Sequence, residues 1–160
     1  MLRTYRQIQE PATASTGCSR RVAAGARESA REMTKPFEIY RCESCGKMLE
    51  VLRAGDGEVA CCGRPMKSVA ENVSDGAIEK HTPIIERLPF GFVVKVGSIP
   101  HPMDVEHHIE WIQLLAEDTV CRKFLSPGHL PRAAFHVETD RVAARHYCNL
   151  HGLWRSSPTA

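Results

Sequence analysis

The residues with the clearest capacity for chemistry lie near the C-terminus, in the segment Arg145-His-Tyr-Cys-Asn-Leu-His-Gly-Leu-Trp154. Cys148 and His151 are three residues apart, so one tight turn can direct a thiolate and an imidazole at the same metal ion. Alone this pair is weak, because the spacing arises often by chance and a half-buried Cys beside a surface His is the simpler interpretation. A metal site here needs further ligands from elsewhere in the chain.

Four other cysteines form a second pattern. Cys42-x-x-Cys45 is followed, after fifteen residues, by the adjacent pair Cys61-Cys62 and then Gly63. Four thiolates at these positions can enclose one tetrahedral metal ion, and such a site often stabilises a domain that is too small to support its own core. The spacing by itself favours zinc and iron about equally.

Further histidines lie upstream of Cys148, in Glu79-Lys80-His81-Thr82-Pro83, in His101-Pro102-Met103 and at His107. With Cys148-Asn-Leu-His-Gly-Leu-Trp154, they resemble the active site of the desulfoferrodoxin (superoxide reductase) family, over roughly residues 37 to 155. The resemblance implies a catalytic iron with these ligands: His81, His101, His107, Cys148 and His151. Four imidazoles and one thiolate exceed the four ligands that zinc prefers, and they suit a square-pyramidal iron(II) with an open sixth position.

The resemblance also assigns roles to residues beside these ligands. Lys80 is expected to attract the superoxide anion and assist its protonation, and Glu79 to close the sixth position of the oxidised iron, although most Glu-Lys pairs are solvated ion pairs. Asn149 and Leu150 are expected to present backbone N–H groups to the Cys148 sulfur. The pair Cys61-Cys62 makes the first cluster similar to desulforedoxin, which implies an iron that relays single electrons, bound by Cys42, Cys45, Cys61 and Cys62.

The remaining histidines are interpreted as hydrogen-bonded within the fold or exposed, not as ligands: His108, His129, His136 and His146. Because side chains alternate along a strand, His107 is expected to share the drier face with Ile109 and Trp111, whereas His108 lies with Glu110. His146 is the strongest competitor, because alternation places it on the same side as Cys148. Its role is left open by the sequence.

These sites need elements to hold them. Strand patterns are predicted at 37–41, 48–53 and 58–60, and, after a linker at 67–75, at 83–88, 92–99, 107–115, 120–125, 133–138 and 142–147. This rhythm predicts an all-β sandwich. The resemblance implies the finer description: a rubredoxin/desulforedoxin-like metal domain at 33–70, followed by an immunoglobulin-like β-sandwich at 71–155. Residues 1–32 and 156–160 are predicted to be disordered. The first is either a flexible extension, a targeting peptide or translated sequence upstream of the true start.

Composition and charge exclude several function classes. A hydrophobic content of 42% with 25% charged residues is ordinary for a globular protein, and no apolar run approaches the ~20 residues needed to cross a bilayer. Residues 1–32 hold six Arg and three Glu, which leaves 15 basic and 16 acidic residues in the rest, so nucleic acid is not an expected partner. Seven cysteines, mostly at metal-type spacing, indicate a reducing, cytoplasmic setting.

The sequence therefore predicts an iron-dependent superoxide reductase, which reduces superoxide by one electron to hydrogen peroxide and evolves no oxygen. The resemblance implies Fe(2+)/Fe(3+) at two mononuclear non-haem sites per chain, a rubredoxin-like electron donor and a homodimer. Two alternatives stay open: superoxide dismutation at the same iron, and a pair of structural zinc modules in an interaction protein. Oxygen evolution and metal analysis distinguish them.

Overall fold

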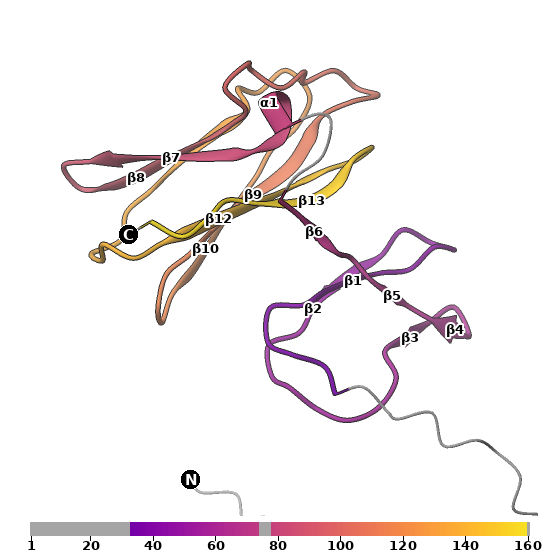
Figure 1. Ribbon diagram of the computed structural model, residues 1–160. Coiled ribbons are helices and arrows are strands. Elements are labelled where there is room, and N and C mark those ends of the chain that lie inside the picture. The colour runs from indigo at the N-terminus through magenta and orange to yellow at the C-terminus, as the bar shows by residue number, and fades with distance from the viewer. Residues whose placement is uncertain (1–32, 74–77, 160) are drawn as a thin grey trace, which may run out of the picture. The chain divides into compact units, whose positions relative to one another are not determined.

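The computed structural model of the chain describes residues 33–73 and 78–159. The predicted leader, residues 1–32 with Cys18, lies outside the described residues, as do residues 74–77 and 160. The described residues form thirteen strands and one four-residue helix (Figure 1). The all-β prediction is therefore confirmed. No helix among these residues is long and apolar enough to span a membrane.

The first domain is built from short strands. β1 (Ile39–Arg41) pairs antiparallel with β2 (Met48–Glu50) on one side and with β5 (Lys67–Ser68) on the other. β3 (Ala60–Cys61) forms a separate hairpin with β4 (Arg64–Pro65). Only a few apolar side chains of this domain are buried, among them Ile39, Cys42 and Met66. So small a core is typical of domains that a bound metal stabilises.

The second domain is a sandwich of two sheets (Figure 1). The larger sheet has the strand order β10 (Val120–Phe124), β9 (Ile109–Leu115), β12 (Ala143–Cys148), β13 (Gly152–Arg155) and β6 (Glu71–Asn72). The smaller sheet has the order β11 (Arg132–Phe135), β8 (Gly91–Val96) and β7 (Pro83–Leu88). The helix α1 (Ile78–His81) immediately precedes β7. Together, the sandwich and the small metal-type domain match the predicted fold class.

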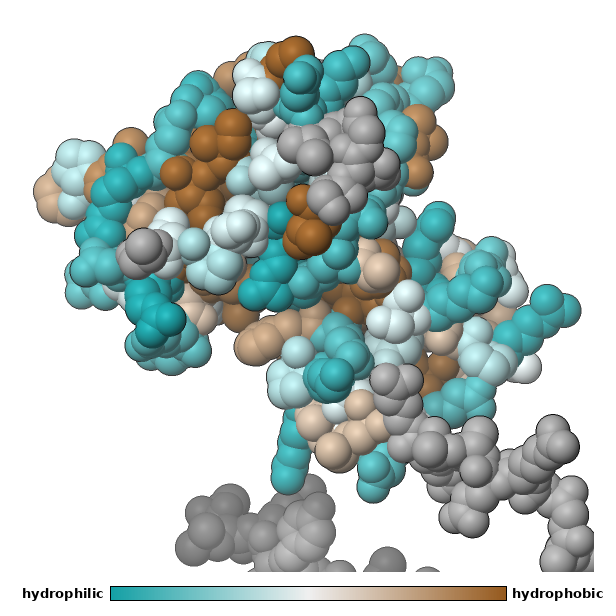
Figure 2. Space-filling view, viewed as in Figure 1, coloured by the Kyte–Doolittle hydropathy of each residue, from teal (hydrophilic) through white to brown (hydrophobic). Residues whose placement is uncertain are grey.

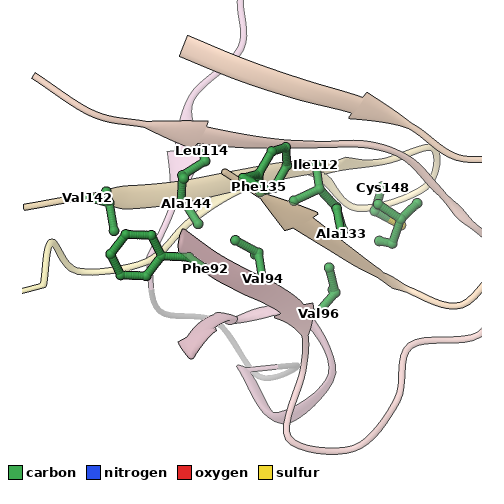
Figure 3. Packing of buried hydrophobic residues seen from close by; sticks show 11 residues of the cluster. Phe92, Val94, Val96, Ile112, Leu114, Ala133, Phe135, Val142, Ala144 and Cys148 are labelled. Carbon is green, nitrogen blue, oxygen red and sulfur yellow. The ribbon is translucent and has the colours of Figure 1, made fainter. Parts of the chain in front are cut away.

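Alternating apolar residues fill the space between the two sheets (Figure 3). Phe92, Val94 and Val96 point inward from β8, because successive side chains of a strand face opposite sides. They meet Ile112 and Leu114 from β9, together with residues of β11 and β12. Cys148, at the end of β12, belongs to this same cluster. The core therefore extends to one of the predicted metal ligands and can hold it in place.

The outer face of β9 and β12 packs against the first domain. Trp111 and Tyr147 form a second buried cluster with Ile39 of β1 and Leu153 of β13. On the face seen in Figure 2, hydrophobic side chains form separate small patches among hydrophilic ones.

Three predicted boundaries differ from the structure. The segment 67–75 was predicted as a linker, but in its described part β5 pairs with β1 and β6 runs parallel to β13. Residues 156–159 were predicted to be a disordered tail, yet the hydroxyls of Ser156 and Thr159 accept hydrogen bonds from backbone N–H groups of residues 144 and 142. β13 was not predicted at all. Backbone pairing with residues distant in sequence organises these segments, and local composition does not reveal such pairing.

Candidate metal centres

The structure brings five predicted ligands into one group, the His/Cys site, in which all ligand atoms lie within 4.8 Å of one another. His81 ends α1, and Cys148 is the last residue of β12. The other members lie in the loop between β8 and β9 and in the turn before β13: His101, His107 and His151. His81, His101 and Cys148 are buried, whereas His151 is exposed. His151 and the half-buried His107 are therefore the ligands that solvent reaches most easily.

The four imidazoles of this site form a square. Rings adjacent around the square stand nearly perpendicular, with centroids 4.5 to 4.8 Å apart, in the order His81, His101, His107 and His151. The diagonal between His81 and His107 is longer, 6.3 Å. The ring nitrogens face inward: His81 Nε2 lies 3.2 Å from His101 Nε2 and 3.1 Å from His151 Nδ1. His107 Nε2 is also 3.1 Å from His151 Nδ1.

These distances fit one metal ion at the centre of the square. Two nitrogens bound at about 2.1 Å and at right angles are about 3.0 Å apart, whereas tetrahedral angles give about 3.4 Å. Two of the three spacings, both 3.1 Å, are closer to the square arrangement, and the third, 3.2 Å, lies between the two. The Cys148 sulfur lies 3.5 Å from His151 Nδ1 and supplies the fifth ligand atom. The donor set therefore suits a five-coordinate ion such as iron better than four-coordinate zinc.

Local hydrogen bonding and burial keep these imidazoles in a metal-binding form. His101 Nδ1 lies 2.6 Å from the Pro102 carbonyl oxygen, which can only accept, so Nδ1 carries the proton and Nε2 faces the site with a lone pair. Burial lowers the pKa of His101 to about 4. Burial and the neighbouring His151 likewise lower the pKa of His107. Both rings are therefore neutral near pH 7, as metal binding requires.

The Cys148 sulfur is held in an apolar setting with two backbone donors. Burial raises the pKa of the Cys148 thiol, and hydrogen bonds from the N–H groups of His151 and Leu150 partly offset this rise. The role predicted for Leu150 agrees with this, whereas the Asn149 N–H donates to the His108 carbonyl oxygen at 3.1 Å and not to the sulfur. Asn149 also acts through its side chain: Oδ1 accepts from the N–H of His108, and Nδ2 donates to the Glu106 carbonyl. It thereby ties the Cys148 turn to the loop that carries His107.

Trp154, to which the sequence assigns no separate role, supports two of the ligands. Its Nε1 donates to the His151 carbonyl at 3.1 Å, which fixes the turn between β12 and β13. Its ring stacks on the His81 ring, with centroids 4.7 Å apart and an interplanar angle of 16°. The sequence signal that could have indicated this contact is a tryptophan three residues after the Cys-x-x-His turn.

Ile109 and Trp111 do not share a face of β9, contrary to the prediction that placed His107 with both of them. The pairing of β12 with β9 shifts in register after Tyr147, so that Tyr147 lies opposite Trp111 while Cys148 lies opposite Ile109. This irregularity places Ile109 in the sandwich core and Trp111 in the cluster against the first domain. His107 itself lies before the strand begins. Alternation across a bulge does not hold, because the extra residue reverses the phase.

Glu79 and Lys80 lie exposed on α1, next to His81. The pKa of His107 is lowered mainly by burial and by the charge of His151, and to a smaller extent by the charge of Lys80. The charge of Asp104 raises this pKa. Lys80 is thus electrostatically coupled to the site. The backbone of α1 approaches Gly97 closely: a Cβ built there would lie 2.7 Å from the Lys80 carbonyl oxygen and 2.8 Å from that of Glu79.

The other four histidines are outside the group of ligand atoms. His129 and His136 are exposed, as predicted. His146 differs from its interpretation, because it is fully buried and neither ring nitrogen has a hydrogen-bond partner. His108 also has an unpartnered buried Nδ1. The ring of His146 lies parallel to that of His81, with centroids 6.3 Å apart, and burial lowers its pKa well below the usual value.

The four predicted cysteine ligands of the first domain also come together, as the four-cysteine site: Cys42, Cys45, Cys61 and Cys62. The Cys61 sulfur lies 3.7 Å from that of Cys45 and 3.8 Å from that of Cys62. Four sulfurs bound tetrahedrally at about 2.3 Å are about 3.8 Å apart, so the spacing fits one metal ion. Cys62 has a φ of 53°, a left-handed conformation that lets adjacent cysteines face the same centre.

Electrostatics in the four-cysteine site also call for a cation. Backbone N–H groups, first that of Cys45, lower the pKa of Cys42 to about 6, so one thiolate forms readily. Hydrogen bonding to Cys45 and the other sulfurs raises the pKa of Cys62 to about 12. Four thiolates therefore cannot coexist near neutral pH without a positive charge among them, and a metal ion supplies it.

Comparison with known proteins agrees with this geometry. The family model described as Desulfoferrodoxin matches residues 73–157, and that of the Desulfoferrodoxin N-terminal domain matches residues 34–69. Desulfoferrodoxins from Nitratidesulfovibrio vulgaris and Desulfarculus baarsii are 52% and 48% identical over 124 residues, which cover 78% of this chain and 98% of each relative. The superoxide reductase structure from Treponema pallidum aligns with a TM-score of 0.61 and 30% identity, over 80% of this chain and 99% of that one. The chain belongs to the desulfoferrodoxin family.

Proposed function

We propose that this protein is a superoxide reductase, which converts superoxide, one electron and two protons into one molecule of hydrogen peroxide. The observation that carries the proposal is the square of four imidazole nitrogens with a buried thiolate beside it. Family membership and the similarity to a structure named superoxide reductase support it.

Iron(II) held by His81, His101, His107, Cys148 and His151 would supply the electron and an open coordination position, and the thiolate would favour electron transfer to an oxygen species. The protein provides five ligands, three of which are buried, so that most of the site is shielded from solvent. Lys80, exposed beside the opening, draws the anion in and assists its protonation. Glu79, its neighbour on α1, is the candidate to close the open position after the reaction.

The four-cysteine site is proposed to hold a second iron that relays electrons to the first. Its sulfur spacing supports one tetrahedral metal ion, and that geometry accepts zinc as well as iron. The same proposal includes domain limits of 33–70 and 71–155, a rubredoxin-like donor, a homodimer and a cytoplasmic location.

Metal analysis combined with Cys148→Ser tests the function. The purified protein should contain two irons per chain, and the variant should lose superoxide reductase activity while the four-cysteine site stays coloured. Cys121→Ser is the matched control, because Cys121 is a free, half-buried cysteine on β10 that belongs to neither site. Stoichiometric zinc at both sites, with no effect of Cys148→Ser, would contradict the proposal. Oxygen evolution from superoxide would instead indicate dismutation.

A further inference from the structure

The two metal sites differ in how much of their ligand set reaches the surface. In the four-cysteine site Cys45 and Cys62 are exposed and Cys61 is half-buried. In the His/Cys site Cys148, His81 and His101 are buried. A redox partner can therefore bring its own centre close to the four-cysteine site without any rearrangement of the protein.

Exposed cations flank the cysteines of the four-cysteine site along the chain. The segments that carry its cysteines, residues 41–47 and 60–68, contain only one acidic residue, Glu43. They contain four basic residues, all exposed, which we call the basic rim: Arg41, Lys47, Arg64 and Lys67.

Three members of the basic rim are adjacent to a cysteine in sequence, in a backbone hydrogen bond or in strand pairing, and the fourth, Lys67, is paired with one of these three. Arg41 precedes Cys42, and the Lys47 carbonyl accepts a hydrogen bond from the Cys42 N–H at 2.9 Å. Arg64 is the cross-strand partner of Cys61. Lys67 is the cross-strand partner of Arg41 and pairs with Glu43 at 2.8 Å.

The opening of the His/Cys site has the opposite balance of charge. The segments around its ligands, residues 79–81 and 101–108, contain Glu79, Asp104 and Glu106, all exposed, against the single cation Lys80. A small anion can still enter beside Lys80. A protein with an acidic surface is repelled there and attracted to the basic rim.

An ion pair accounts for only one member of the rim: Lys67 pairs with Glu43, whereas Arg41, Lys47 and Arg64 have no ion-pair partner among the described residues. Arg41 and Lys67 lie directly opposite each other on paired strands, where like charges are destabilising. The competing explanation is that the rim only compensates the negative charge of a metal with four thiolates. The two explanations differ in what a change of charge at the rim affects.

Resting on the proposed relay function, we propose that the basic rim is the docking surface of the electron donor, a small protein whose redox centre is surrounded by acidic residues. The donor loses one electron and the metal of the four-cysteine site gains it, and no bond forms or breaks. Charge complementarity speeds the encounter and orients the two centres, so the reaction should be faster at low ionic strength.

The first test uses protein loaded with zinc, so that binding is measured without electron transfer. A rubredoxin with an acidic surface serves as the probe, and its affinity is measured by calorimetry at several salt concentrations. Arg64→Glu should weaken binding about tenfold at low salt and reduce the salt dependence. The matched control is Arg132→Glu, which makes the same charge change on the exposed side of β11 in the smaller sheet. Equal effects of the two variants, or no effect of Arg64→Glu, would overturn the docking proposal.

The second test uses protein loaded with iron and follows reduction of the four-cysteine site by reduced rubredoxin. Arg64→Glu should slow this step about tenfold, while basic ferricytochrome c should oxidise the reduced variant faster than the wild type. Both rates, reduction by rubredoxin and oxidation by ferricytochrome c, are measured at several salt concentrations. If the rim only compensates the negative charge of the metal with four thiolates, Arg64→Glu shifts the reduction potential of the site but does not change how either rate depends on salt. That result also overturns the proposal.

Failure of the relay itself gives a different result. In that case rubredoxin still binds at the rim and Arg64→Glu still weakens it, but Cys45→Ser does not slow reduction of the iron in the His/Cys site.

Discussion

Lys80 shows what a single side chain contributes at the opening of the His/Cys site. It is exposed on α1 and electrostatically coupled to His107, with Asp104 acting in the opposite sense. Lys80→Ala should slow the second-order reaction with superoxide about tenfold and flatten its dependence on ionic strength. Stopped-flow kinetics at several salt concentrations measure both effects.

Lys80→Arg is the control for this prediction, because it keeps the charge and should keep most of the rate. A wild-type rate and salt slope in Lys80→Ala would show that Lys80 is only a surface residue beside a ligand.

Gly97 packs against the backbone of α1, which carries Lys80 and His81, although it lies far from them in the sequence. Its φ is +80°, and a Cβ there would come within 2.8 Å of three backbone carbonyl oxygens, those of Glu79, Lys80 and Ile99. Gly97→Ala should therefore displace α1, lower the content of the His/Cys metal and reduce the free energy of unfolding by more than the ~1–2 kcal/mol of a left-handed residue alone. Chemical denaturation and metal analysis check this.

Gly128→Ala is the control that separates backbone strain at positive φ from a steric clash of the new Cβ with neighbouring atoms. Gly128 has nearly the same φ, +82°, but open space around its Cβ position. Equal losses of stability in the two variants would refute the idea that contact with α1 requires glycine at position 97.

At the scale of elements, β12 serves both domains because its two faces have different neighbours. Ala144 and Cys148 face the sandwich core, whereas Arg145 and Tyr147 face the first domain. Arg145 is buried and forms ion pairs with Glu50 of β2 at 2.7 Å and with Glu71 of β6 at 2.9 Å. It also donates to the Phe37 carbonyl and to Gln113 of β9. One strand thus carries a metal ligand and a charged contact with the first domain.

The Arg145 network makes stability depend on pH. Burial raises the pKa of Glu50, but hydrogen bonds from Gln113 and Arg122 and the charges of Arg122 and Arg145 outweigh it, so the pKa lies below its usual value. A carboxyl whose pKa is lowered by folding stabilises the protein above the unfolded pKa, about 4.3 for Glu, and this stabilisation is lost as the pH falls through the folded pKa.

Glu50→Gln should therefore cost about 3 kcal/mol of unfolding free energy at pH 7 and progressively less below about pH 4.3. Chemical denaturation of both proteins from pH 7 to pH 3 measures the difference between their free energies of unfolding. The effect of acid on the metal sites cancels in this difference because both proteins have the same sites. Glu117→Gln, at an exposed position, is the control. A difference that stays constant with pH would show that the ion pairs of Glu50 do not stabilise the fold.

For the whole molecule, the two metal sites should divide the work. The structure places their ligands in two separate groups. Cys45→Ser should therefore leave the single-turnover reaction of the reduced His/Cys iron with superoxide nearly unchanged, while re-reduction by rubredoxin slows. Rapid-mixing kinetics on protein with known iron content measure the two steps separately. Loss of the fast single-turnover reaction, with that iron still bound, is the outcome that would rule out a pure relay.

Residue type and spacing, together with the family resemblance that they carry, were enough to predict both ligand sets. The Cys-x-x-His turn, the Cys-x-x-Cys and Cys-Cys pairs and the His-containing segments nominated nine residues, and the structure gathers all nine into two groups. The alternation of apolar residues was enough to predict an all-β fold. These features are local, because a tight turn or a strand pattern is defined within a few residues.

Only the tertiary structure decided how those residues are arranged. The square of imidazoles, the stacking of Trp154 on His81 and the approach of α1 to Gly97 join segments far apart in the chain. The register shift in β9 could not be predicted, because it depends on pairing with β12. The same holds for the burial of Arg145 and His146, since a sheet has two faces and its packing partners determine which polar side chains are enclosed.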